Sequence, residues 1–453
     1  MDKKTPAANR ITEGVIWKQI MYLFFPILLG TFFQQFYNTV DMVIVGRFVG
    51  TEALASVGGS SALIINFVVG FFTGLGGGAS VIISQYYGAK IEKKLNDSIH
   101  TAYAFAIAGS ILITILGIVV SPWLLKIMNT PEELLVDSAA YLCIYFGGII
   151  FVFIYNIGSG ILRALGDTRR PLIYLIVCCF INIVLDLVTI IVFHMGIAGA
   201  ALATVIAQGV SAVLVTIALM RSKDIYKLEL RKIRFHKRIL LSELYIGLPT
   251  GIQSTTYSLS NMILQTTVNS FGTVVTAAWA TLGKLDAIVW MISGAFGIAV
   301  TTFVGQNYGA GKYTRLHKGI KVALGLDFFV SVFLGIFLIT FRIPLFKIFT
   351  TDAGVIENGA FMIEQLAPFY WMFVFIEILS SALRGISDVI IPTMINLSGV
   401  CLLRLAWIFL VIPKYPTMKT VIMNYPVTWV ATSVLFVIYY AYRMKKQNWQ
   451  QTI

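Results

Sequence analysis

The stretch "FINIVLDLVTIIVF", residues 180–193, is typical of a lipid-facing helix except for an amide, Asn182, and a carboxylate, Asp186. These two residues are spaced i, i+4 and therefore share one helix face. An ionised carboxylate at the centre of a membrane helix costs about 2.5–3.5 kcal/mol on insertion scales, so such residues normally face the bundle interior and have partners. The stretch therefore predicts a membrane helix with one polar face turned toward other helices.

The composition of the whole chain agrees with this prediction. Of its 453 residues, 58% are hydrophobic and 12% are charged, and the mean hydropathy is +0.84. A water-soluble domain of this length does not reach such values. Apolar runs of about 20 residues, the length that crosses a bilayer, recur from Trp17 to Tyr442, and we count twelve of them. The polar N-terminal stretch runs directly into a full-length span, so no cleaved leader is expected. We expect an all-α integral membrane protein.

The net charge of +13 is distributed as a topology signal. With alternate loops assigned to the side of the N-terminus, 26 of the 34 Lys and Arg residues fall on that side and six on the other. An excess of this kind marks the cytoplasmic loops. We therefore expect a multi-pass protein of the cell inner (plasma) membrane with both termini cytoplasmic. The basic residues would contact anionic lipid headgroups, and no nucleic-acid partner is expected.

Two sequence motifs recur at a constant spacing of 221 residues. "SQYYGAK" at 84–90 matches "GQNYGAG" at 305–311, and "LRALGDTRRP" at 162–171 matches "LRGISDVIIP" at 383–392. Six spans are an even number, so the two halves run in the same direction and should be related by a pseudo-two-fold axis along the membrane normal. The predicted organisation is an N-lobe at 1–220, a solvated basic cytoplasmic linker at 221–238, and a C-lobe at 239–453. Paired bundles of this kind usually carry a substrate pathway.

Counting along the spans places three oxygen-bearing residues at a similar depth. Asp41 in span 1, Asp186 in span 5 and Thr204 in span 6 all fall in the outer half of the membrane at about 1.5 Å per residue. Together with Asn182 they would suit a hard monovalent cation, or the two carboxylates would share a proton. The alternative is a hydrogen-bond network that merely fastens these spans. Pro26 removes a backbone hydrogen bond from span 1 and is expected to kink it.

The C-lobe spans contain charges of their own. Glu377 is the repeat mate of Asn156, and Arg404 lies in the neighbouring span. These two form a candidate ion pair, either structural or involved in coupling or substrate binding. Lys284 and Asp286 are two residues apart and therefore need separate partners.

The sequence disfavours nucleotide binding, catalysis and metal or redox chemistry at cysteines. "GQNYGAGKY" at 305–313 has the wrong glycine spacing for a nucleotide loop, and Tyr313 stands where Ser or Thr is needed. The glycines of "FVVGFFTGLGGGAS" at 67–80 are expected to let membrane helices approach closely. The sequence contains no HExxH motif, no cluster of His residues and no GxSxG motif that would indicate an enzyme. The cysteines have neither zinc nor redox spacing and are expected to be core residues; they are Cys143, Cys178, Cys179 and Cys401.

The sequence resembles the multidrug and toxic compound extrusion (MATE) transporters over nearly its whole length. The resemblance rests on Pro and then Asp in span 1, the "QYYGAK" and "QNYGAG" loops, both "LR…D…P" loops, and "GIAGAALATVIAQ" in span 6. It implies a V-shaped pair of lobes and export of amphipathic, often cationic, compounds coupled to inward Na⁺ or H⁺. The family's N-lobe cation site falls on Asp41, Asn182, Asp186 and Thr204, with Tyr37 and Asn156 as accessory positions.

One departure from the family concerns the C-lobe. The NorM-type branch has a functional Glu in span 7, whereas no acidic residue occurs here between Glu243 and Asp286. The N-lobe is therefore the better candidate for coupling.

The predicted function is that of a secondary active antiporter, not an enzyme, that exports drugs or toxic compounds in exchange for Na⁺ or H⁺. Its expected partners are an amphipathic small molecule and membrane lipid, with no cofactor other than the coupling ion and no obligate protein partner. The main alternative is a lipid-linked precursor flippase of the same superfamily, which would need a cationic cavity suited to phosphate. A membrane receptor or enzyme is a further alternative.

Overall fold

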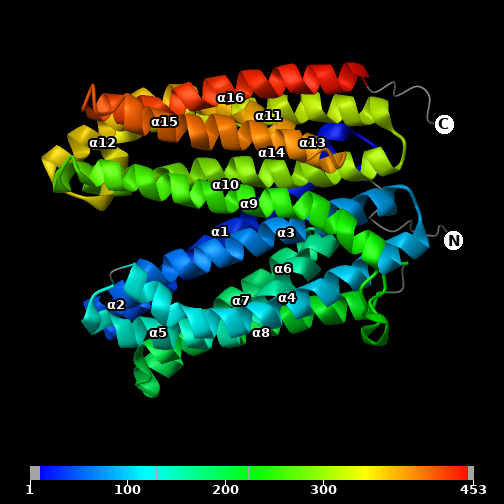
Figure 1. Cartoon of the computed structure of the whole chain (residues 1–453), viewed down its shortest axis with the longest axis horizontal. Helices are drawn as coiled ribbons and strands as arrows, with labels where there is room; N and C mark the ends of the chain where they lie inside the picture. Colours follow the sequence, from blue (N-terminus) through cyan, green and yellow to red (C-terminus); the bar gives the residue numbers. More distant parts are fainter. Residues whose placement is uncertain (1–10, 129, 223–224, 447–453) are drawn as a thin grey trace. The chain divides into compact units, whose positions relative to one another are not determined.

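The computed structural model describes residues 11–128, 130–222 and 225–446, and every regular element in these ranges is a helix (Figure 1). The first half contains α1 (Ile16–Phe48), α2 (Thr51–Ser56), the π-helical segment η2 (Val57–Ser61), α3 (Ala62–Gly88), α4 (Glu92–Ile127), α5 (Glu132–Gly147), α6 (Ile149–Ala164), α7 (Arg169–Leu187), the π-helical segment η3 (Val188–Val192) and α8 (Gly196–Met220). The second half contains η4 (Leu230–Lys232), α9 (Lys237–Asn269), α10 (Thr273–Gly309), α11 (Tyr313–Phe349), α12 (Ala353–Leu366), η5 (Ala367–Phe369), α13 (Tyr370–Gly385), α14 (Ile390–Asn396), η6 (Leu397–Leu402), α15 (Leu403–Leu410) and α16 (Met418–Lys446).

Eleven of the twelve expected spans meet the length and composition of a membrane helix. Within the described residues ten helices do so singly, and α5 and α6, bent by 48°, make an eleventh when they are taken as one span. The twelfth expected span is α9, which is long enough at 33 residues but carries the polar run "QSTTYSLSN" at 253–261. The predicted all-α, multi-pass fold is confirmed. Helices suit membrane spans because their backbone N–H and C=O groups hydrogen-bond within the helix and need no water.

The first repeated motif ends a helix in the same way in both halves. After α3, Lys90 has a positive φ of 56°, and Ile91 N–H donates to the carbonyl of Tyr86 at 3.1 Å. After α10, Gly311 has a φ of 69°, and Lys312 N–H donates to the carbonyl of Asn307 at 2.9 Å. Both are Schellman caps, in which the residue after the C-cap is left-handed.

The second repeated motif is also a pair of matching caps. Gly166 after α6 and Ser387 after α13 have φ values of 91° and 64°. The next residues, Asp167 and Asp388, donate to the carbonyls of Leu162 and Leu383, each at 2.9 Å. The repeated sequences are therefore helix-ending signals, and the "GQNYGAGKY" turn does not form a nucleotide loop.

The helices pack into two compact units. Unit 1 contains Phe25–Gly251, and the described residues of unit 2 are 11–24 and 252–446. The chain thus passes from unit 2 to unit 1 inside α1, directly before Pro26, and back inside α9, two residues after Pro249. The α9 passage lies beyond the 221–238 segment that the sequence analysis assigned as the connector.

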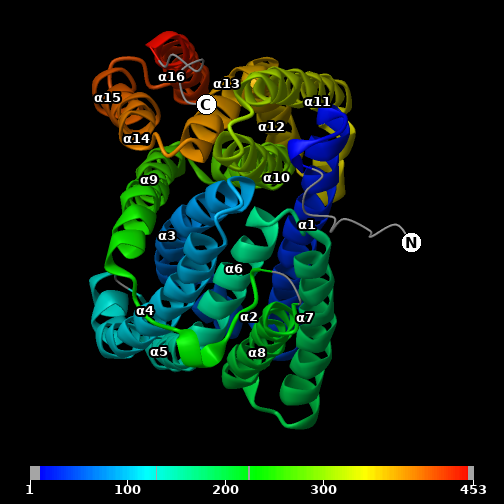
Figure 2. The ribbon, with the colours of Figure 1, turned by 90° about the vertical axis from the view of Figure 1, so that its right-hand side faces the viewer.

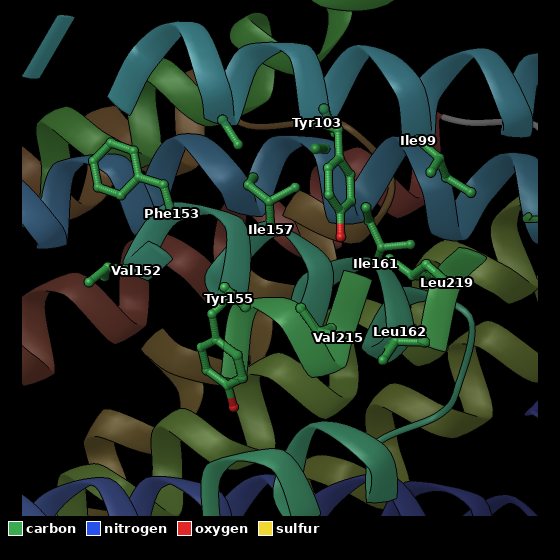
Figure 3. Close-up of a cluster of buried hydrophobic side chains, with 14 of the residues drawn as sticks. Ile99, Tyr103, Val152, Phe153, Tyr155, Ile157, Ile161, Leu162, Val215 and Leu219 are labelled. Atoms are coloured by element: carbon green, nitrogen blue, oxygen red, sulfur yellow. The ribbon is translucent and has the colours of Figure 1, made fainter. Parts of the chain in front are cut away.

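A large cluster of buried apolar side chains in unit 1 includes residues of α4, α6 and α8. Figure 3 shows side chains of these helices pointing toward one another, among them Tyr103 of α4 and Val215 of α8. Gly158 of α6 lies beneath both, since an added Cβ would come within 2.8 Å of Val215 and 3.0 Å of the Tyr103 hydroxyl. Because lipid tails are as apolar as these side chains, close packing of this kind holds membrane helices together.

The glycine-rich segment of α3 packs directly against α9 within unit 1. An added Cβ at Gly74 would lie 2.6 Å from the backbone nitrogen of Gly251, and one at Gly78 would collide with the carbonyl oxygen of Glu243. The prediction that small residues permit close helix contact is confirmed here.

The linker is more ordered than the sequence suggested. Leu228 is buried and Tyr226 nearly so, and both belong to the unit 1 core. The backbone N–H of Glu229 donates to Nε2 of His100 at 3.1 Å. The expectation of a wholly solvated linker is therefore wrong, because its apolar side chains dock on α4 and α8 while most of its basic residues stay exposed.

Candidate cation site

The four predicted site residues come from three helices of unit 1. Asp41 lies on α1, Asn182 and Asp186 on α7, and Thr204 on α8. Their exposed fractions are 8%, 1%, 0% and 9%, so each is buried inside the unit. The structure brings them together as helix counting proposed.

Two interactions join these residues. The carboxyl groups of Asp41 and Asp186 lie near enough to interact electrostatically. Nδ2 of Asn182 donates a hydrogen bond to Oγ1 of Thr204 at 3.4 Å. The amide nitrogen is used in this way, whereas the carbonyl oxygen of Asn182 accepts no hydrogen bond.

Four oxygen atoms of the site have no hydrogen-bond donor. They are Oδ1 of Asp41, Oδ1 of Asn182 and both carboxyl oxygens of Asp186. Neither acid takes part in a salt bridge with a residue that the structure describes. Burying an unpaired carboxylate is expensive, so such a group either binds a cation or is neutralised by a proton.

Tyr37 is placed beside the site by a partner that the sequence analysis missed. Nε2 of Gln208 on α8 donates to the Tyr37 hydroxyl at 3.2 Å. Tyr141 of α5, 6% exposed, also lies near enough to interact electrostatically with both Asp41 and Asp186. Gln208 had a usable signal, because it lies one helical turn after Thr204 and shares its face. Tyr141 had none, because the sequence does not report which face of α5 turns toward the acidic pair.

Two other predicted accessory residues are not joined to the site by contacts. Asn156 is half-buried on α6, and no hydrogen bond links it to the four site residues in the described ranges. Pro26 lies inside α1, which continues as one helix through it.

The predicted ion pair between Glu377 and Arg404 is wrong. Nη1 of Arg404 donates to Oδ1 of Asn261 at 2.7 Å, and its guanidinium lies 4.5 Å from the centre of the Tyr425 ring. Glu377 instead accepts a hydrogen bond from Ser381 at 3.4 Å. The two charges belong to neighbouring spans but face different helices.

Lys284 and Asp286 have the separate partners that their spacing required. The Lys284 ammonium lies 5.4 Å from the centre of the Phe349 ring. Asp286 accepts a hydrogen bond from the hydroxyl of Tyr370. All four cysteines are free thiols. The prediction that they are core residues is confirmed for Cys178, Cys179 and Cys401, which are buried, whereas Cys143 is only half-buried.

A helical membrane protein with duplicated helix ends and a buried acidic cluster within its spans has the features of a secondary transporter. The MatE family model matches residues 26–188 and 249–410, and the chain belongs to this family of multidrug efflux transporters, which are not enzymes. The two matched segments correspond to the two halves seen in the repeated caps.

Curated relatives agree over most of the chain. The sequence is 28% identical over 442 residues to the probable multidrug resistance protein YoeA of Bacillus subtilis, covering 96% of this chain and 95% of that protein. It is 23% identical over 358 residues to the multidrug export protein MepA of Staphylococcus aureus, covering 78% of each chain.

A solved structure shares the fold. This is the outward-facing conformation of a multidrug resistance MATE family transporter of the MOP superfamily, with a TM-score of 0.90, 21% identity and full coverage of both chains.

Proposed function

We propose that this chain is a secondary antiporter that exports amphipathic, often cationic, small molecules in exchange for Na⁺ or H⁺. The observation that carries the proposal is the buried pair Asp41 and Asp186, which forms no salt bridge with any residue in the described ranges and presents oxygens without hydrogen-bond donors. We further propose that the protein lies in the cell inner membrane with both termini cytoplasmic, on the basis of the loop charges.

The cation would act by neutralising the acidic pair. A proton or Na⁺ removes the repulsion between Asp41 and Asp186 and changes the hydrogen bonding among α1, α7 and α8. Cation and exported compound need not meet, since linkage requires only that each prefers a different state of the protein. Coupling energies of this kind are typically about 1–3 kcal/mol.

The exposed surfaces of α1 and α3 suit amphipathic compounds. Gln34, Gln35 and Asn38 are exposed on α1, and Asn66 is exposed on α3, where a lipid-facing helix would carry apolar side chains. Amides beside exposed aromatic residues such as Phe36 provide the mixed surface that promiscuous binding uses. The names of YoeA and MepA support multidrug export as the activity.

The test is uphill export from proteoliposomes loaded with a fluorescent amphipathic cation such as ethidium. A Na⁺ gradient and a pH gradient are imposed separately, which identifies the coupling ion. Asp41→Asn and Asp186→Asn should each abolish uphill export, whereas Glu133→Gln, an exposed carboxylate on α5, should not. Wild-type export by a stably folded Asp41→Asn, Asp186→Asn double variant would refute the proposed role of the pair.

A further inference from the structure

An open pocket of about 430 Å³ lies in unit 2, at the end of α11 and the beginning of α12. These two helices pack against each other within the unit (Figure 2). The pocket walls are apolar except for four charged side chains, which are Arg342, Lys347, Glu357 and Glu364. Apolar walls with a few charges of both signs suit an amphipathic molecule that carries both charges itself.

Two of the four charges satisfy each other, and two do not. Nη2 of Arg342 lies 2.6 Å from Oε1 of Glu364, in a salt bridge that joins α11 to α12. Lys347 and Glu357 are exposed, and neither forms a salt bridge with any residue that the structure describes. The pocket therefore offers a ligand one ammonium group and one carboxylate.

An exposed apolar line along α11 leads to this pocket. Its members recur at alternating spacings of four and three residues, which places them on one helix face; they are Phe329, Phe333, Ile336, Thr340, Ile343 and Lys347. Its four hydrophobic members are between 44% and 74% exposed. At 1.5 Å per residue the line is about 27 Å long, close to the thickness of about 30 Å of a bilayer's hydrocarbon core. Lys347 therefore lies at the level where the hydrocarbon ends and the lipid headgroups begin.

The charges of the pocket match those of one kind of lipid headgroup. Phosphatidylethanolamine carries a phosphate, which a lysine ammonium attracts, and a primary ammonium group, whose three N–H donors a carboxylate accepts. Phosphatidylcholine has the same two charges, but its quaternary ammonium group has no N–H donor. Phosphatidylglycerol has no cation and would place its negative charge near Glu357.

We propose that this pocket binds the headgroup of one phosphatidylethanolamine molecule, with the phosphate at Lys347, the ammonium group at Glu357 and an acyl chain along the exposed line of α11. The matching positions of the first half lack one of the two charges. At the repeat spacing of 221, Lys347 corresponds to Lys126, whereas Glu357 corresponds to Val136. We therefore expect the site in unit 2 and not at the corresponding helix ends of unit 1.

The experiment titrates the full-length protein in detergent with phosphatidylethanolamine, phosphatidylcholine and phosphatidylglycerol of identical acyl chains, and measures binding by native mass spectrometry. Phosphatidylethanolamine should bind about two- to fivefold more tightly than the other two, the range expected for an exposed ion pair. Lys347→Gln should abolish this preference. Glu357→Gln retains the partner of the phosphate, so phosphatidylglycerol should then bind as tightly as phosphatidylethanolamine.

The matched controls are Lys126→Gln and Glu133→Gln, which remove exposed charges from α4 and α5 in unit 1. Both should retain the preference for phosphatidylethanolamine. Equal binding of the three lipids by the wild type would overturn the proposal, as would an unchanged preference in the folded Lys347→Gln and Glu357→Gln variants.

A thermal measurement distinguishes the lipid from a soluble zwitterion. Phosphatidylethanolamine should raise the melting temperature of the wild type, whereas phosphoethanolamine at the same concentration should not, because it lacks the acyl chain. Equal stabilisation by the two would show that the pocket recognises the headgroup alone and would overturn the assignment to lipid. Neither measurement involves transport, so a failure of ethidium export in liposomes would leave this result unaffected.

Discussion

The side-chain amide of Gln208 on α8 donates a 3.2 Å hydrogen bond to the hydroxyl of Tyr37 on α1, and both residues are buried. Tyr37 lies one helical turn before Asp41, and Gln208 lies one turn after Thr204. This bond therefore fixes α1 against α8 next to the acidic pair, and it sets the distance between the helices that supply the candidate ligands.

Tyr37→Phe should destabilise unit 1 and weaken cation binding. The substitution removes only the hydroxyl, which leaves the buried Gln208 amide without its acceptor at a cost of about 1–3 kcal/mol. The melting temperature in detergent should fall, and adding Gln208→Leu should restore part of the loss because no unpaired polar atom remains. Tyr415→Phe, at a residue 65% exposed, is the control. Equal melting temperatures for Tyr37→Phe and wild type would contradict this account.

Gly78→Ala should prevent α3 and α9 from packing at their present distance. The new methyl group would collide with the Glu243 carbonyl, which is backbone and cannot rotate away. We expect reduced yield of folded protein and a lower melting temperature, measured by fluorescence-detected size-exclusion chromatography after heating. Gly77→Ala is a closely matched control, because nothing lies within 4 Å of an added Cβ there. Equal yields of folded protein and equal melting temperatures for the two variants would show that the α3–α9 interface can accommodate the added methyl group.

Arg315→Lys should loosen the segment that precedes α1. The Arg315 guanidinium donates to the carbonyls of Ile11, Glu13 and Gly14, with its shortest bond, to Gly14, at 2.6 Å. A lysine keeps the charge but cannot span three carbonyls with one ammonium group. Faster hydrogen–deuterium exchange in the peptide that contains residues 11–15 is expected.

The control for this measurement is Lys318→Gln, which removes an exposed charge one turn along α11. It should leave exchange of the same peptide unchanged. A rate in Arg315→Lys equal to that of wild type would show that these bonds do not hold the segment.

Cysteine labelling tests the proposed topology. A cysteine at Ser222 should resist membrane-impermeant thiol reagents in intact cells, whereas one at Glu132, between the spans on the opposite side, should react. Gln447 lies outside the described residues, as do the basic residues at 1–10, and a cysteine at 447 tests the C-terminus in the same way. The four native thiols are replaced first. Rapid labelling at Ser222 would reverse the assignment.

Much of the fold follows from sequence because lipid restricts the possibilities. A long apolar run has to be a helix in a bilayer, so the helical class and the succession of spans could be predicted. The repeated motifs identified the two halves, and the structure adds that each motif ends a helix in a left-handed cap. The division of α1 and α9 between two units could not be predicted in the same way, because it depends on which helix faces pack together, and hydropathy does not report that.

The candidate site shows the same limit. Depth can be counted from the helix rise, and this grouped Asp41, Asp186 and Thr204. The rotation of a helix about its own axis cannot be inferred when both of its faces are apolar. For this reason Glu377 and Arg404 were paired wrongly.

Where the structure describes it, the passage of the chain between its two units occurs inside helices rather than in loops. The described crossings are in α1 next to Pro26 and in α9 next to Pro249, while the 221–238 segment docks on unit 1. A flexible loop would absorb any rotation of one unit against the other, but a continuous helix resists it elastically. Each proline removes one backbone hydrogen bond, which makes these two points the most compliant along each helix. Asp41 lies four turns beyond the first of them, so strain applied at one end of α1 would be felt at its carboxylate.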